Sequence, residues 1–239
     1  MAASSPTTAM VFAAGLGARM RPLTQTTPKP LVRVAGKTLI DRALDDFAAA
    51  GVETAIVNVH HLADKIEAHL ADRARPRIIV SDERARLLDQ GGGIKKVLPL
   101  FEDRPFFICN TDAFWIGAGA ANLHALARAW DAGKMDAALL LAPTKGGVGV
   151  DWDGDFDLDA DGRIVKGVGA KPYVYSGVGI IKPELFANMD EAVFKLAPLF
   201  FDAAKIRRLF GVVADGLWLQ VGTVGAIAEA ERAIAALAT

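Results

Sequence analysis

The chain alternates two patterns of apolar residues. Short continuous apolar runs are typical of buried strands, whereas apolar residues that recur every three or four positions are typical of helices with one buried face. Runs of the first kind cover residues 10–12, 54–59, 77–81, 106–110, 136–142, 173–181, 212–214 and 217–221. Helical spacing covers residues 39–50, 62–70, 94–100 and 122–133, a stretch that starts near Pro198, and the segment that Thr223 caps. Strands that alternate with helices in this way predict an α/β fold with a mostly parallel sheet.

The length of the chain limits how this fold is divided. A chain of 239 residues suits one large domain with a sizeable core. Residues 1–8 are mostly small and polar, which predicts a frayed tail before a single domain over residues 9–239. A turn signal predicts a hairpin of residues 156–158 and 164–165. We place this hairpin in a small lid subregion at about residues 145–200.

The charge balance is close to neutral, and it excludes some partners. The formal net charge of −1 gives no electrostatic reason to expect a nucleic-acid or membrane partner. The single cysteine, Cys109, excludes an internal disulfide, fits a reducing cytoplasm and lies in an apolar run, where we expect a buried thiol. No secretory signal or membrane-length apolar run is recognisable. We therefore expect a soluble cytoplasmic protein, monomeric or weakly homo-oligomeric.

The first candidate site follows the first predicted strand directly. Gly15 and Gly17 lack side chains, so backbone N–H groups there can approach an anion such as a phosphate. Arg19, Arg21 and Lys29 come next along the chain. The segment matches neither the Rossmann fingerprint nor the P-loop motif. From spacing alone, a polyanion site and a turn with solvated basic side chains both remain open.

Two further features add candidate chemistry. Gly91, Gly92 and Gly93 precede the helix predicted over residues 94–100, and exposed amides at a helix N-terminus can bind a planar base or an anion. The alternative for three glycines is a loop that needs positive φ. Asp112 follows a buried strand, where ligands of open parallel sheets bind and where a carboxylate can hold Mg²⁺. A helix cap or a turn is the alternative for this aspartate.

The stretch from Ala13 to Leu31 reads G-x-G-x-R-x-x-P-L-T followed by P-K-P-L. It resembles the signature of the sugar-nucleotide pyrophosphorylases, which join a nucleoside triphosphate to a sugar 1-phosphate. The resemblance implies a three-layer α/β/α sandwich, with a mostly parallel, Rossmann-like sheet of the nucleotide-diphospho-sugar transferase type. It also implies that Arg19 and the glycine loop hold the triphosphate and that Lys29 reaches the α-phosphate.

The same resemblance implies a set of site residues. Catalytic roles fall to Arg19, Lys29 and Asp112. Substrate-binding roles fall to Ala13, Gly15, Leu16, Gly17, Gln90, Gly91, Gly92, Asn110, Ser176, Gly177 and Lys195. Lys195 is implied to meet the sugar phosphate, although a solvated lysine before a helix is an equal alternative.

Two positions depart from the family pattern. Thr111 occupies a position that is usually glycine, which leaves the carboxylate of Asp112 in place. Gln220 occupies the position of the aspartate that is usually the second Mg²⁺ ligand, so the implied metal residues are Asp112 and Gln220. A glutamine carbonyl can coordinate a hard cation but brings no charge. We expect substrate phosphates to compensate for the missing charge at position 220, because Mg²⁺ commonly binds through one or two carboxylates plus phosphates.

The run of three glycines and residues 194–199 resemble the branch of the family that uses UTP to activate N-acetylmuramic acid 1-phosphate. The expected reaction is Mg²⁺-dependent and gives the UDP-sugar and pyrophosphate, as part of peptidoglycan recycling. One alternative keeps the chemistry with another pair of substrates, GTP or dTTP with a mannose, heptose or glucose 1-phosphate. The other, motivated by Gln220, is a catalytically silent sensor that binds nucleotide sugars.

Overall fold

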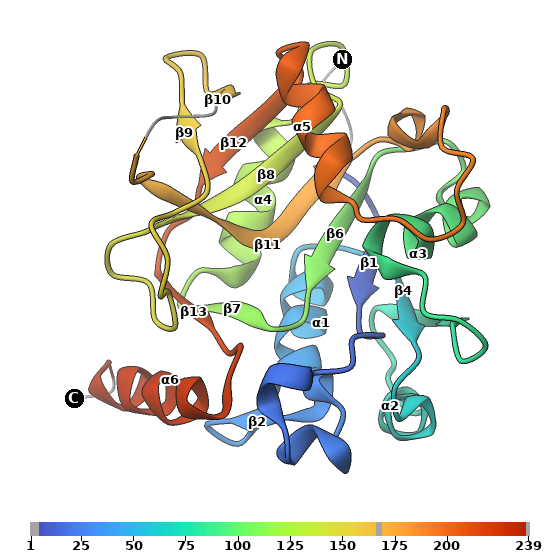
Figure 1. Ribbon diagram of the computed structural model, residues 1–239, viewed down its shortest axis with the longest axis vertical. Helices are drawn as coiled ribbons and strands as arrows, with labels where there is room; N and C mark the ends of the chain where they lie inside the picture. The colour runs from blue at the N-terminus through green and yellow to red at the C-terminus, as the bar shows by residue number, and fades with distance from the viewer. Residues whose placement is uncertain (1–4, 166–168, 238–239) are drawn as a thin grey trace.

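The computed structural model describes residues 5–165 and 169–237. Its centre is a seven-stranded sheet in the order β12-β8-β11-β6-β1-β4-β5 (Figure 1). The strands are β1 (Thr8–Phe12), β4 (Thr54–Val59), β5 (Arg77–Asp82), β6 (Phe106–Asn110), β8 (Ala137–Pro143), β11 (Tyr173–Ile181) and β12 (Leu209–Val213). Neighbouring strands are parallel except at β11, which runs antiparallel to both β6 and β8. The predicted mostly parallel sheet is confirmed.

Helices cover both faces of this sheet, as strands buried on both faces require. One face packs against α1 (Leu39–Ala49), α2 (Ala63–Leu70) and α4 (Gly119–Ala129). The other packs against α3 (Asp89–Val97) and α5 (Ala197–Lys205). Within β1, Ala9 and Val11 join the first core and Met10 joins the second, because side chains alternate along a strand. The three-layer α/β/α fold is therefore confirmed.

A third, smaller core lies beneath the glycine loop, at the lower end of the molecule in Figure 1. It packs α6 (Val224–Ala236) against short segments that flank the loop, through residues such as Met20, Val32 and Ala230. Thr223 caps α6 as predicted, since its hydroxyl accepts the N–H of Ala226. This packing fixes the chain that follows the loop.

Three short antiparallel pairs complete the described fold. They are β2 (Arg33–Val34) with β3 (Lys37–Thr38), β7 (Ala113–Ile116) with β13 (Leu217–Gln220), and β9 (Asp157–Leu158) with β10 (Ile164–Val165). The last is the predicted hairpin. We did not predict β7, and its pairing takes the closing strand over residues 217–221 out of the main sheet.

The predicted frayed tail over residues 1–8 is wrong for Thr7 and Thr8. Strand β1 begins at Thr8, and the carbonyl of Thr7 accepts the N–H groups of Glu53 and Thr54. Residues 1–4 lie outside the described residues. The strand reaches further back because the sheet neighbour supplies hydrogen bonds that no local apolar pattern records.

The prediction for the three glycines needs correction. Helix α3 begins at Asp89, so Gly91, Gly92 and Gly93 lie inside it rather than before it, and none has a positive φ. Close packing explains them: a Cβ at Gly91 would meet the ring of Phe194, and one at Gly92 would meet the carbonyl of Ala192. The glycines are therefore required because neighbouring segments pack closely against them, and not because the backbone forms a turn there.

Helix α4 also differs from its prediction over residues 122–133. It begins at Gly119 and ends at Ala129, because Trp130 adopts an extended conformation with ψ of 125°. In the described part of the chain, no helix is long and apolar enough to cross a membrane. Cys109 is buried as expected, and desolvation by burial raises the pKa of its thiol.

Asp46 on α1 gives the fold a testable pH dependence. Desolvation by burial raises the pKa of its carboxyl to about 6; the positive charges of Lys37 and Arg42 oppose this shift without cancelling it, and the negative charge of Asp45 adds to it. Because this pKa lies above the unfolded value of 3.8, the carboxylate costs stability, and the cost grows as the pH rises through about 6. Between about pH 4 and 7, we expect the wild type to lose roughly 1–2 kcal/mol more free energy of unfolding than Asp46→Asn does. Denaturant melts at both pH values measure this difference, and identical losses in the two proteins would contradict it.

Candidate functional site

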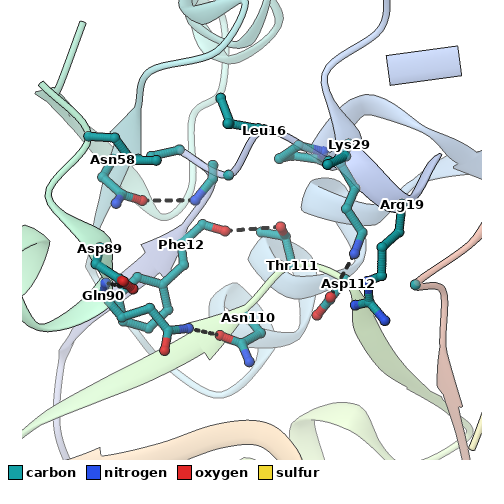
Figure 2. A pocket seen from close by; sticks show the side chains of 18 residues that line it. Phe12, Leu16, Arg19, Lys29, Asn58, Asp89, Gln90, Asn110, Thr111 and Asp112 are labelled. Atoms are coloured by element: carbon teal, nitrogen blue, oxygen red, sulfur yellow. Dashed lines mark hydrogen bonds and ion pairs between the residues drawn. The ribbon is translucent and has the colours of Figure 1, made fainter. Parts of the chain in front are cut away.

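A cavity of about 520 Å³ opens beyond the carboxyl ends of β1, β4 and β6. It is lined by Phe12, Ala13, Ala14, Gly15, Leu16, Gly17, Ala18, Arg19, Lys29, Pro30, Asn58, Leu87, Asp89, Gln90, Asn110, Thr111, Asp112 and Gly222. Figure 2 shows Arg19, Lys29 and Asp112 on one side, and Asn58, Asp89 and Gln90 on the other. The cavity thus has a charged end and an end lined mainly by amide side chains.

The two glycines of the loop are required for different reasons. Gly17 has a φ of 62°, and a Cβ there would lie 2.8 Å from Cγ2 of Thr24. The hydroxyl of Thr24 also donates to the carbonyl of Gly17 at 2.9 Å, which fixes the turn. Gly15 has no positive φ, and a Cβ there would meet nothing within 4 Å. The described chain therefore does not require glycine at position 15, and a side chain there would enter the open space of the cavity.

Gly15→Ala should therefore leave the fold intact while it weakens binding of a polyphosphate. We expect a melting temperature within about 2 °C of the wild type and a dissociation constant for the nucleotide raised by about tenfold, because the methyl group enters the cavity. Thermal melts and calorimetric titration measure the two effects. The control is Gly17→Ala, where strain and the clash with Thr24 should cost about 1–3 kcal/mol of stability. Normal nucleotide binding by Gly15→Ala would contradict this role.

The cations of the charged end differ in their surroundings. Arg19 is exposed, lines the cavity and forms no hydrogen bond or ion pair with any described residue. Its guanidinium lies against Gly222, where a Cβ would be 3.3 Å from Nη1. Lys29 begins the 3-10 helix Lys29–Leu31, and its Nζ lies 2.7 Å from Oδ2 of Asp112. An unpaired guanidinium beside a paired ammonium can bind phosphate oxygens.

Asp112 lies in the turn between β6 and β7. The hydroxyl of Thr111 donates to the carbonyl of Phe12 at 3.0 Å, which ties the end of β6 to the end of β1. The N–H of Val221 donates to the carbonyl of Asp112 at 2.7 Å, and Gln220 pairs with Ala113. The last strand thus brings Gln220 next to Asp112 along the backbone, although Gln220 does not line the cavity.

The donor set suits a metal ion held largely by its substrate. Among the described residues, no group of three or more His, Cys, Asp or Glu side chains could hold a metal. Asp112 does present a carboxylate to the cavity, and an oxygen ligand of this kind fits a hard cation. A metal ion bound there would take most of its ligands from phosphate oxygens and water.

Most of the predicted site residues come together. Ala13, Gly15, Leu16, Gly17, Arg19, Lys29, Gln90, Asn110 and Asp112 all line the cavity. The side-chain amide of Gln90 donates to Oδ1 of Asn110 at 2.7 Å, so the two share one wall (Figure 2). Gly177 lies directly behind Asn110, since a Cβ there would be 3.0 Å from Cβ of Asn110. Asn110 is therefore held from both sides.

The remaining predicted residues lie outside the cavity. The predicted exposed amides of Gly91 and Gly92 are wrong, because both are buried and both donate to the carbonyl of Phe194. Ser176 is also buried, and its hydroxyl donates to the carbonyl of Leu140 at 2.6 Å. Lys195 is exposed just before α5 and has no partner among the described residues. The polar groups of Gly91, Gly92 and Ser176 therefore donate to backbone carbonyls of neighbouring segments and do not face the cavity.

Sequence reasoning missed several residues that line the site, above all Asn58. This amide interrupts the apolar run of β4 and is buried, and its Oδ1 accepts the N–H of Ala13 at 2.8 Å. A buried polar residue within an apolar strand is itself a signal, because such a group needs a hydrogen-bond partner. Leu87, Asp89 and Gly222 carried no signal of that kind.

The fold and the cavity define an α/β protein with an open cavity at the carboxyl edge of its sheet, lined by a glycine loop and two cations. Residues 9–215 match the model of the MobA-like NTP transferase domain. The N-acetylmuramate α-1-phosphate uridylyltransferase of Caulobacter vibrioides is 48% identical, over 97% of this chain and 98% of that protein. The enzyme of the same description from Neisseria meningitidis is 37% identical, over 93% of this chain and 96% of its own length.

A solved structure agrees in fold. The inositol-1-phosphate CTP transferase of T. maritima superposes with a TM-score of 0.74 at 18% identity, over 95% of this chain and 97% of that one. The chain therefore belongs to the family of sugar nucleotidyltransferases with a MobA-like NTP transferase domain, and the expected family is confirmed. Nucleotidyltransferases of this family generally use a divalent metal ion.

Proposed function

We propose that the protein transfers a uridylyl group from UTP to N-acetyl-α-D-muramic acid 1-phosphate and releases pyrophosphate. The main support is the extent of similarity to two uridylyltransferases of that description, which spans nearly the full length of all three chains. The cavity supplies the chemistry such a transfer needs: an open glycine loop, and two cations, Arg19 and Lys29, with the carboxylate of Asp112 beside them. We further propose that the reaction takes place in the cytoplasm and serves peptidoglycan recycling.

In this reaction an oxygen of the sugar phosphate attacks the α-phosphorus of the nucleotide. The bond from that phosphorus to the oxygen shared with the β-phosphate breaks, and pyrophosphate leaves with the electron pair. No protein nucleophile is required, so catalysis consists of positioning and of neutralising the charge that moves onto the leaving group. Arg19 and the amides of the glycine loop hold the departing pyrophosphate, and Lys29 binds the α-phosphate.

The Lys29–Asp112 ion pair has to open for this role. Its ammonium and carboxylate are part-buried, and a phosphate oxygen that enters beside Lys29 competes with the carboxylate for the same cation. Asp112 is the residue that would hold Mg²⁺, since it lines the cavity and Gln220 does not. When bound, that ion adds positive charge beside the phosphates. Because position 220 carries no carboxylate, the phosphates would supply most of the ligands of Mg²⁺.

The end of the cavity lined mainly by amide side chains is the proposed site of the nucleobase. Gln90 and Asn110 present amide groups there, which can pair with the donors and acceptors of uracil. The sugar phosphate then lies toward β11 and Lys195. Phe194, the neighbour of Lys195, is held against α3 by the N–H groups of Gly91 and Gly92. These glycines thus act on the sugar side of the site through the segment they anchor.

The test is release of pyrophosphate from Mg²⁺, UTP and N-acetylmuramic acid 1-phosphate. Parallel reactions contain CTP, GTP or dTTP, and the 1-phosphates of glucose, mannose and a heptose. We expect rapid release only with the first pair. Release with another pair would correct the substrates and keep the reaction. Nucleotide binding with no release from any pair would instead favour the silent sensor and point to Gln220.

A further inference from the structure

Glu83 is a buried carboxylate outside the cavity. It follows β5 directly, is 2% exposed and forms no ion pair with any described cation. Its main chain is anchored independently, because its N–H donates to the carbonyl of Val59 at 2.8 Å and its carbonyl lies 2.8 Å from Nδ1 of His60. A buried carboxylate without a cation is costly, so its hydrogen bonds must serve the fold or the site.

Those hydrogen bonds form a chain with a fixed direction. The N–H of Ala13 donates to Oδ1 of Asn58 at 2.8 Å, and Nδ2 of Asn58 donates to Oε1 of Glu83 at 2.8 Å. The N–H of Leu88 donates to Oε2 of Glu83 at 3.0 Å. Ala13 and Leu88 can only donate, so the carboxylate accepts from both ends of the chain.

This series of hydrogen bonds lies behind the cavity and connects two parts of its lining. Ala13 opens the glycine loop, and Leu88 lies between Leu87 and Asp89 on the wall that we assign to the nucleobase. Figure 2 shows Asn58 on that side, together with Asp89 and Gln90. Gly93 closes the arrangement, since a Cβ there would be 2.8 Å from Oε1 of Glu83. The third glycine of the run therefore leaves room for this carboxylate.

We propose that Glu83 and Asn58 are positioning residues that fix the distance between the glycine loop and the nucleobase wall. They act on nucleotide binding through Ala13 and Leu88, while the sugar phosphate binds independently of them. This inference rests on the proposed function in one respect, that the cavity binds a nucleoside triphosphate.

Each hydrogen bond in this series has a fixed donor and a fixed acceptor. Variants that reverse donor and acceptor can therefore distinguish a positioning role from a role in burial alone. In Glu83→Gln the side chain keeps one acceptor and gains a donor, so it faces either Asn58 or Leu88 donor to donor. In Asn58→Asp the donor toward Glu83 is lost, and two carboxylates face each other. The double variant N58D/E83Q restores every bond: the carboxylate introduced at position 58 accepts from Ala13 and from the amide introduced at position 83, whose oxygen accepts from Leu88. Both the net charge and the shape are kept.

The experiment compares the wild type, the two single variants and the double variant. For each protein it measures the dissociation constant of UTP with Mg²⁺, the KM of each substrate and the melting temperature. We expect each single variant to bind UTP at least about tenfold more weakly, with the KM of the sugar phosphate unchanged. The double variant should return to within about threefold of the wild type. If the wild type binds a different triphosphate, only the substrate proposal fails, and that nucleotide replaces UTP throughout.

Asn122 provides a matched control. It is buried to the same degree as Asn58, at 3% exposure, and its amide bonds both the N–H and the carbonyl of Asp215 at 2.9 Å. Asn122→Asp should lower the melting temperature and leave UTP binding unchanged. The positioning role is overturned if Glu83→Gln behaves like this control, or if a folded N58D/E83Q binds UTP as weakly as the single variants.

Discussion

Asp112→Asn is expected to lower kcat by about 10²–10³-fold with little change in stability. The substitution keeps the shape of the side chain and removes the charge that pairs with Lys29 at 2.7 Å. In the proposed reaction this carboxylate is the one charged protein ligand that the described cavity offers to a metal near Lys29. Its loss removes both the metal ligand and the anion that orients the ammonium. Steady-state pyrophosphate release over a Mg²⁺ titration measures the effect.

The matched control is the ion pair of Lys182 and Asp136. Its side chains are 18% and 19% exposed, against 15% and 23% for Lys29 and Asp112, and it lies outside the cavity. Burial alone would raise the pKa of Asp136, but hydrogen bonds from Arg208 and Lys182 outweigh it and lower that pKa. Asp136→Asn should therefore destabilise the fold above about pH 4 and leave kcat unchanged. If Asp112→Asn only destabilises in the same way, Asp112 has no part in the reaction.

Arg19→Ala should lower turnover by a similar factor, about 10²–10³-fold, while the fold survives. Arg19 is exposed and has no partner among the described residues, so its removal breaks no bond in the ligand-free protein. Its guanidinium faces the cavity beside Gly222, where the leaving pyrophosphate is proposed to lie. The charge on that group grows in the transition state, so the loss should appear mainly in kcat.

Arg21→Ala is the control for Arg19. Arg21 is exposed and lies two positions away, but it does not line the cavity. The two variants change the net charge equally, so a difference between them isolates position from charge. We expect Arg21→Ala to keep near-normal turnover. Near-normal turnover by Arg19→Ala would remove Arg19 from the mechanism.

The predictable part of the site is local in sequence. The motif around Gly15 and Arg19 lies in one segment, and Asp112 follows its strand directly, so strand ends could be read from apolar runs. The contacts between these parts are not local. Lys29 and Asp112 are 83 residues apart, and Ala13 and Asn58 are 45 apart. No pattern of nearby residues indicates such pairs, because parallel strands meet only after the crossovers have formed.

The glycine run shows where local reasoning fails. Three glycines disfavour a helix, so the sequence predicts that α3 starts after them. In the structure Phe194, Ala192 and Glu83 leave no room for side chains at these positions, and tertiary packing outweighs the helix propensity.

By itself, the sequence determined the alternation of strands and helices, the position of the glycine loop and the family to which the chain belongs. These depend on periodicity and on a contiguous motif, which are fixed by covalent order. Only the tertiary structure decided that Asn58 and Glu83 stand behind the cavity, that Lys29 pairs with Asp112, and that Ser176 is turned inward. These depend on which distant segments pack together, because burial and hydrogen-bond partners are properties of the folded chain alone.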